Sequence, residues 1–302
     1  GSGITLSPDG DIFATGISTF SEGIADDITI NSITVGKGAN SQSGNTVLGE
    51  SALDANTTGS KNPVVGYESL TENTTGQENV AVGYRTLDAN TTGDQNVAIG
   101  YVALGANTTG VDNVAVGRAS LDANTTGGKN TAIGNGTLSA STGASYNTAL
   151  GFESLSLDTT GNYNTAAGYY ALRSNTTGTY NVAVGSGALD ANTTGNYNYA
   201  LGKDALGANT TGSVNVAIAN ALTANTTGES NIAVGSNSLN DNTTGSQNVA
   251  VGRQALGDNT TADNNTAVGY NALKLNTTGT NHVAVGAYAL DANTTGNSNT
   301  AV

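Results

Sequence analysis

Residues 79–112 read NVAVGYRTLDANTTGDQ and then NVAIGYVALGANTTGVD, which are two copies of one 17-residue unit. The same register begins at Asn45 and runs to the end of the chain. Asn opens fifteen of its sixteen units, and His282 is the exception. Leu holds position 9 of all fifteen complete units once a one-residue deletion is allowed where Ala219 directly follows Ile218. A fixed period of this length is typical of architectures in which each unit stacks on its neighbours.

Each unit contains two short apolar stretches. Positions 1–5, most often NVAVG, are a β-branched run closed by Gly, and positions 7–11 form a second run closed by NTTG. We predict two strands of about four to six residues per unit, joined by corners where Gly and Asn supply strained backbone. Because one unit cannot bury its apolar face alone, the units must stack. The sequence therefore predicts an all-β fold, a repetitive parallel β-roll or β-solenoid fibre of about fifteen 17-residue rungs.

Stacking places equivalent residues above one another. Rungs about 4.8 Å apart predict a rod about 70 Å long, with an apolar Leu column and an Asn amide ladder. Side-chain burial in one rung falls short of the entropy cost of ordering its residues, which favours a symmetric oligomer that shares an apolar axis. The small residues of position 3 suit close approach of neighbouring backbones in such an oligomer. Examples are Ala81, Ala98, Ala115 and Ala183.

The chain divides into three parts. Residues 1–30 form a β lead-in, residues 31–44 (NSITVGKGANSQSG) a 14-residue unit with the same opening Asn, and residues 45–302 the array of 17-residue repeats. The lead-in is predicted from alternating apolar and polar residues and from a turn at Pro8-Asp9-Gly10. The alternating stretches are Ile4–Leu6, Asp11–Thr15 and Asp27–Thr34. The array ends partway through a unit, so we expect a segment of something longer.

Composition argues against several classes of function. A net charge of −14 with nine Lys and Arg disfavours binding to nucleic acid or anionic membrane. With no Cys and one His, the common catalytic triads and His-rich metal sites cannot be assembled. We therefore expect that the chain is not an enzyme and binds no cofactor. The lack of Cys also fits an extracellular protein. The sequence has no run of about 18 apolar residues, so no membrane insertion is predicted. The first twenty residues lack the pattern of a signal peptide.

Two segments resemble known repeat families. NSITVGKGANSQSG is similar to the 14-residue repeat of YadA-type trimeric autotransporter heads, which are left-handed parallel β-rolls around a three-fold axis. The 17-residue unit resembles repeat arrays of bacteriophage tail fibres and of bacterial surface proteins. Residues 7–39 (SPDGDIFATGISTFSEGIADDITINSITVGKGA) are similar to tail-fibre proteins of marine cyanophages. The repeat resemblance covers about 270 of 302 residues.

This resemblance implies the structural shaft of an extracellular homotrimeric fibre. The favoured hypothesis is a virion tail fibre that holds a receptor-binding tip and mediates host attachment. Its expected partners are copies of itself, adjoining fibre or baseplate proteins and a host-surface glycan. The alternatives are a bacterial cell-surface trimeric adhesin head that binds host or matrix and, from the Thr-rich corners, an ice-binding β-solenoid.

Tyrosine columns are the candidate binding residues. Three consecutive units carry Tyr at position 6 and four carry it at position 17. We expect these rings to pack on one another, with glycan contact as the alternative. The residues are Tyr67, Tyr84, Tyr101, Tyr146, Tyr163, Tyr180 and Tyr197.

Other repeated polar residues are interpreted structurally. The NTT triplet, present thirteen times, is formally a glycosylation acceptor, but an Asx-type turn explains it in every rung. His282 is expected to take the ladder role of Asn. Asp at position 10 could offer carboxylates to Ca²⁺, yet other residue types interrupt the column, so no metal site is predicted. These aspartates are Asp54, Asp88, Asp122, Asp190 and Asp291.

Overall fold

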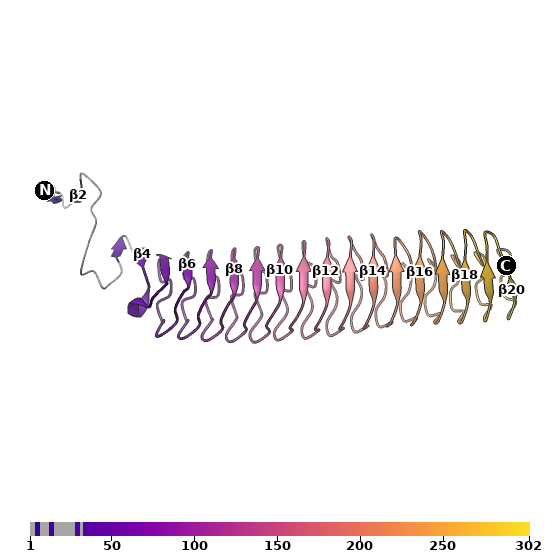
Figure 1. Ribbon diagram of the computed structural model, residues 1–302, viewed down its shortest axis with the longest axis horizontal. Coiled ribbons are helices and arrows are strands. Elements are labelled where there is room, and N and C mark those ends of the chain that lie inside the picture. Colours follow the sequence, from indigo (N-terminus) through magenta and orange to yellow (C-terminus); the bar gives the residue numbers. More distant parts are fainter. Residues whose placement is uncertain (1–3, 7–11, 15–27, 31–32) are drawn as a thin grey trace.

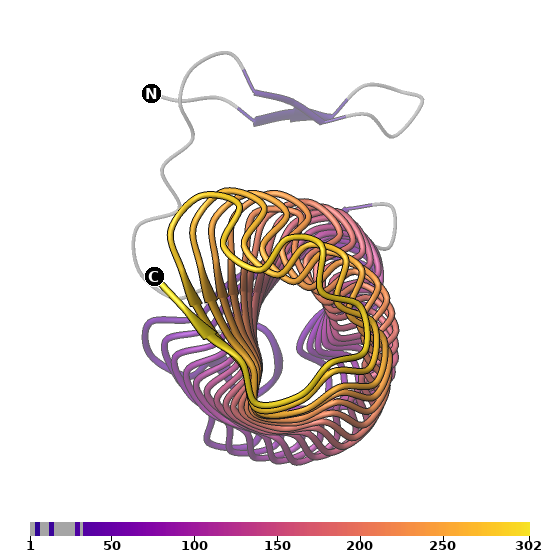
Figure 2. The ribbon, with the colours of Figure 1, turned by 90° about the vertical axis from the view of Figure 1, so that its right-hand side faces the viewer.

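The computed structural model describes residues 4–6, 12–14, 28–30 and 33–302. Figure 1 shows one long stack of short strands along a single axis, and Figure 2, viewed down that axis, shows the rungs superimposing with a slow rotation. The predicted fold is confirmed, because the array is an all-β parallel β-solenoid of about fifteen turns, each about 17 residues long.

The strands of the array pair in strict register. Thr131 pairs with Thr148 and Ala132 with Ala149, a step of one unit that recurs from β5 to β20. Within residues 45–302 the strands are β5 Thr46–Gly49, β6 Pro63–Val65, β7 Val80–Val82, β8 Val97–Ile99, β9 Val114–Val116, β10 Thr131–Ile133, β11 Thr148–Leu150, β12 Thr165–Ala167, β13 Val182–Val184, β14 Tyr199–Leu201, β15 Val216–Ile218, β16 Ile232–Val234, β17 Val249–Val251, β18 Thr266–Val268, β19 Val283–Val285 and β20 Thr300–Ala301.

The segment before the array is built differently. β1 (Ile4–Leu6) and β2 (Ile12–Ala14) form an antiparallel pair at two of the predicted stretches. The predicted turn at Pro8-Asp9-Gly10 lies outside the described residues. β3 (Ile28–Ile30), β4 (Ile33–Gly36) and the 3-10 turn η1 (Ala39–Ser41) follow. β4 pairs antiparallel with both β3 and β5, so the strand of the 14-residue unit runs against the strands of the rungs.

The second predicted strand of each rung is wrong. Each rung of the array carries one strand, near positions 2–4, and the second apolar stretch is a run of turns. Position 9 Leu has a left-handed backbone throughout, with φ between 48° and 56°. The N–H of Leu70 still donates to the carbonyl of Thr86 one rung away, at 2.9 Å. Bonds between rungs therefore satisfy this backbone without a regular strand.

A narrow core runs inside the single chain. Leu at position 9 and the small residues of positions 3 and 8 are almost completely buried, which confirms the predicted Leu column. Ala81, Ala98, Ala115 and Ala183 face this interior and are 0% exposed. The prediction that these alanines lie against neighbouring chains is wrong, because position 3 packs with the Leu column in the interior of the same chain, where Val47 and Val64 are buried as well.

Two amide ladders line the core and confirm the predicted stacking of Asn. At position 1, Asn62 Oδ1 accepts the N–H of Asn79 at 2.9 Å. At position 12, Asn90 Nδ2 donates to Asn73 Oδ1 at 3.0 Å. The ladders meet at Gly93, whose carbonyl accepts Asn79 Nδ2 at 2.8 Å and Asn90 Nδ2 at 3.0 Å. Each buried amide is therefore bonded both within its rung and along the axis.

Candidate interaction surfaces

The outer face of the parallel sheet is apolar and uncharged. Positions 2 and 4 alternate with the buried residue at position 3, so their side chains point outward. From Thr46 to Val302 these positions hold only Val, Ile, Leu, Thr, Ala, Pro and Tyr. Position 4 includes side chains that are 36–51% exposed. These are Leu48, Val65, Ile99, Ile133, Leu150, Leu201, Ile218, Val251, Val268 and Val285.

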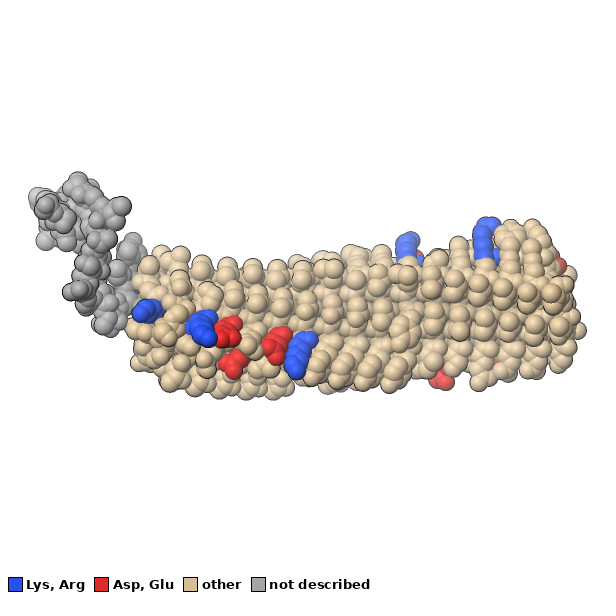
Figure 3. All heavy atoms as spheres, viewed as in Figure 1, with Lys and Arg blue, Asp and Glu red and all other residues tan. Residues whose placement is uncertain are grey.

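This face, called the apolar face below, extends along the rod. Figure 3, which views the strands from outside, shows Lys, Arg, Asp and Glu at its two flanks and a band without them between. By strand geometry the band is about 70 Å long and about 10 Å wide, on the order of 700 Å², against the 300–600 Å² of the largest patch on a typical monomer. A hollow of about 340 Å³ lies within it, lined by Val182, Val184, Tyr199, Leu201, Val216 and Ile218.

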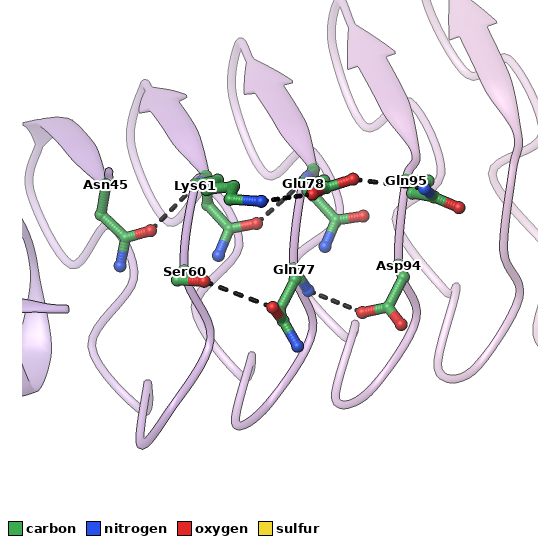
Figure 4. A network of polar contacts seen from close by, with 9 residues as sticks. Asn45, Ser60, Lys61, Gln77, Glu78, Asp94 and Gln95 are labelled. Carbon is green, nitrogen blue, oxygen red and sulfur yellow. Dashed lines mark hydrogen bonds and ion pairs between the residues drawn. The ribbon is translucent and has the colours of Figure 1, made fainter. Parts of the chain in front are cut away.

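One flank carries the position 17 column, where charges and amides are bonded from rung to rung (Figure 4). Lys61 Nζ contacts Glu78 Oε1 at 2.8 Å, and Gln95 Nε2 donates to Glu78 Oε2 at 3.2 Å. The hydrogen bond and charge of Lys61 lower the pKa of the Glu78 carboxyl. Beside them, the N–H of Gln77 donates to Asp94 Oδ1 at 2.7 Å. The flank thus differs chemically from the apolar face.

The predicted tyrosine columns are present as stacked rings. In the position 6 column, Tyr67–Tyr84 and Tyr84–Tyr101 have centroids 5.4 and 5.2 Å apart with planes within 8°. In the position 17 column the three steps are 4.8–4.9 Å with planes within 9°. A third set of stacked rings was not predicted: Phe152 stacks on Tyr169, with ring centroids 5.6 Å apart.

Stacking limits what the tyrosines can bind. Each inner ring has both faces covered by its neighbours, and a cation caps one end of each column, with Arg118 Cζ 5.9 Å from the Tyr101 centroid and Lys129 Nζ 5.2 Å from the Tyr146 centroid. Sugar rings stack on aromatic faces, so here a glycan would meet mainly ring edges and hydroxyl groups. Glycan contact stays a prediction, and packing is the role that the geometry displays.

Replacing Tyr180 with alanine should remove two ring stacks and cost about 1–3 kcal/mol, while Tyr197→Ala should remove one and cost about half as much. Chemical denaturation of both variants measures this ratio, and equal costs would contradict additive stacking. A glycan array probed with the wild type and with Y180A tests binding separately, since a glycan contact requires signal that the variant loses.

The remaining polar candidates lie in structural positions. Asn at position 12 is buried, and its side-chain amide donates to the Gly carbonyl three residues on, as Asn107 does to Gly110. The corner is therefore not the predicted Asx-type turn. A buried, hydrogen-bonded amide is also inaccessible to glycosylation. At position 13 the Thr91 hydroxyl donates to the Thr108 carbonyl at 3.1 Å, which leaves the exposed position 14 as the free Thr column. His282 Nδ1 accepts the N–H of Asn299 at 3.1 Å and so takes the predicted ladder role.

Two of the predicted aspartates share one groove. Asp54 and Asp88 line a hollow of about 420 Å³ that also contains Arg85. Arg85 contacts Asp88 at 2.7 Å and Glu68 at 3.3 Å, so a guanidinium already occupies the acidic cluster. Burial raises the pKa of Asp88, and the bond from Arg85 opposes that rise. Asp122 lies two rungs beyond Asp88 but does not line this hollow, and Asp190 and Asp291 lie further along the rod. Among the described residues, no three His, Asp or Glu side chains are grouped as a metal site.

Comparisons with protein-family models, curated proteins and solved structures give no match for this chain. Within the part of the chain that the structure describes, no helix has the length and apolar character needed to cross a bilayer. The class that the fold defines is therefore the β-solenoid repeat protein with rungs of about 17 residues.

Proposed function

We propose that this chain is the structural shaft of an extracellular fibre in which identical chains pack side by side through the apolar face. The observation that carries the proposal is the continuous uncharged face on a chain of net charge −14. A contiguous exposed apolar surface of this size marks an interaction site. A partner that matches it over every rung needs the same axial period, which a second copy of the chain has.

The rod itself suits a spacer. Its core and its amide ladders close within one chain, and strand pairing is continuous from β5 to β20. Bending would stretch the hydrogen bonds between rungs on the convex side, so the rod resists bending and suits a spacer that keeps its ends apart. Together with the resemblance of the repeats, this favours the homotrimeric shaft of a phage tail fibre that joins baseplate or fibre proteins to a receptor-binding tip.

Light scattering of the wild-type chain should give about 90 kDa, three times the chain mass of 29.8 kDa. The double variant Ile133→Lys, Leu150→Lys places two charges on the apolar face and should give about 30 kDa, because buried unpaired charges are strongly disfavoured. The control Thr126→Lys, Thr160→Lys puts the same charges on the exposed Thr column and should remain near 90 kDa. A wild-type mass near 30 kDa would overturn side-by-side packing.

The kind of fibre is tested separately. Antibodies raised against the array should label the tails of phage particles in immunogold electron microscopy. Labelling of bacterial envelopes instead would favour the surface adhesin. Thermal hysteresis in concentrated solutions of the chain would favour the ice-binding alternative, which the single free Thr column supports poorly.

A further inference from the structure

The position 12 ladder is interrupted at one place in the middle of the rod. Hydrogen bonds between side-chain amides join Asn56 to Asn124 rung by rung. The ladder resumes where Asn175 donates to Asp158. Between them Ser141 replaces Asn, and Asp158 replaces Asn one rung later. All three side chains at the break are buried.

Three buried oxygens at this break have no hydrogen-bond partner within the protein. They are Asn124 Oδ1, Ser141 Oγ and Asp158 Oδ2, which belong to three consecutive rungs. Asn124 Oδ1 lacks the donor that Asn supplies in other rungs, because the Ser141 side chain is two heavy atoms shorter than Asn. Buried polar atoms without partners are rare in folded proteins. Five others occur among the described residues, but only these three hold the same position on three consecutive rungs, which indicates a specific feature.

Asp158 is oriented as the asparagines are. Its Oδ1 accepts Asn175 Nδ2 at 2.7 Å, as an Asn Oδ1 does. Its Oδ2 therefore stands where other rungs carry Nδ2, which donates to the Gly carbonyl of the same rung and to the preceding ladder residue. Only a protonated carboxyl can donate from that position as the amide does.

We propose that the break is a buried hydration site, in which one water molecule bound by Asn124 Oδ1, Ser141 Oγ and the Asp158 carboxyl completes the ladder. The water donates to Asn124 Oδ1, accepts from the Ser141 hydroxyl and forms its third hydrogen bond with the Asp158 carboxyl. Three hydrogen bonds are the usual number for a buried water. The space comes from the two heavy atoms that Ser141 lacks. Burial favours the uncharged carboxyl of Asp158, which matches a neutral ligand such as water.

The variant Ser141→Asn tests the site. Asn fits every other complete rung except that of Asp158, and at 141 it should fill the space, donate to Asn124 Oδ1 and displace the water. Oxygen-17 relaxation dispersion should count one long-lived water fewer in S141N than in the wild type. The control Ser145→Asn makes the same change at position 16 of the same rung, where Asn162 and Asn196 occur in other rungs, and should keep the wild-type count.

Crystallography of the wild type should show one water-like density peak at the break, absent in S141N. An unchanged water count in S141N, or no density at the break at high resolution, would overturn the proposal. A rubidium anomalous peak there, after sodium salts are replaced by rubidium salts, would also overturn it and would identify a cation site instead.

Discussion

Replacing Gly252 with alanine should destabilise the rod by about 3 kcal/mol or more. Gly252 occupies position 5 with φ of 128°, a backbone region that L side chains rarely adopt. A Cβ built there would lie 2.5 Å from the carbonyl oxygen of Gly269 on the next rung, and the rigid stack cannot move away. Strained backbone and steric overlap therefore act together.

The matched control lies in the same rung. Gly257 at position 10 has no positive φ, and a Cβ there would lie 3.3 Å or more from the neighbouring atoms. Gly257→Ala should change stability by less than about 1 kcal/mol. Denaturant unfolding and hydrogen exchange of β17 (Val249–Val251) and β18 (Thr266–Val268) compare the two variants. Equal unfolding midpoints would show that position 5 tolerates a side chain.

The chain itself contains one replacement of this Gly. Ala219 takes the place of Gly at position 5 in the 16-residue rung, and its φ is 70° instead of the 125–146° of the positive-φ glycines at this position. The shorter rung thus follows a different backbone path at its corner. The missing Gly and the deleted residue thus occur in the same unit, whose corner does not adopt the φ of the other rungs.

The period predicted the fold because a stack converts sequence repetition directly into register. Leu53 to Leu290 had to form a column and Asn79 had to bond Asn62 once rungs were stacked. The left-handed backbone of Leu at position 9 could not be predicted, since residue preferences disfavour it and only hydrogen bonds between rungs hold it. The second strand was wrong for the same reason.

The apolar face was not predicted from the sequence, because the smaller residue of each strand is buried and the larger ones are exposed. In NVAVG the larger residue would ordinarily be assigned to the core and Ala to a surface between chains. Here Ala98 is buried while Ile99 is exposed, because Leu104 of the same rung fills the narrow interior. The alternation of strand faces was visible in the sequence, but its direction depends on the volume left inside a closed rung.

The stability of the rod should fall as pH rises from about 4 to about 7, and Asp158→Asn should remove a large part of that fall. Burial raises the pKa of Asp158 from 3.8 to about 7, opposed by hydrogen bonds from Asn175 and Gly161. Because the folded state holds the proton more tightly, its stabilising effect is complete below pH 4 and is lost as pH rises through 7. The difference corresponds to roughly 4 kcal/mol.

Thermal and denaturant unfolding of the wild type and D158N, measured between pH 4 and pH 8 at constant ionic strength, test this effect. D158N should match the wild type near pH 4 and exceed it by several kcal/mol at pH 8, since the side-chain amide of the variant donates to the Gly161 carbonyl at every pH. Burial also raises the pKa of Asp122 and Asp190, but both remain in D158N and cancel in the difference. Parallel pH profiles for the two proteins would mean that Asp158 is ionised in the folded rod and that the ladder tolerates its charge.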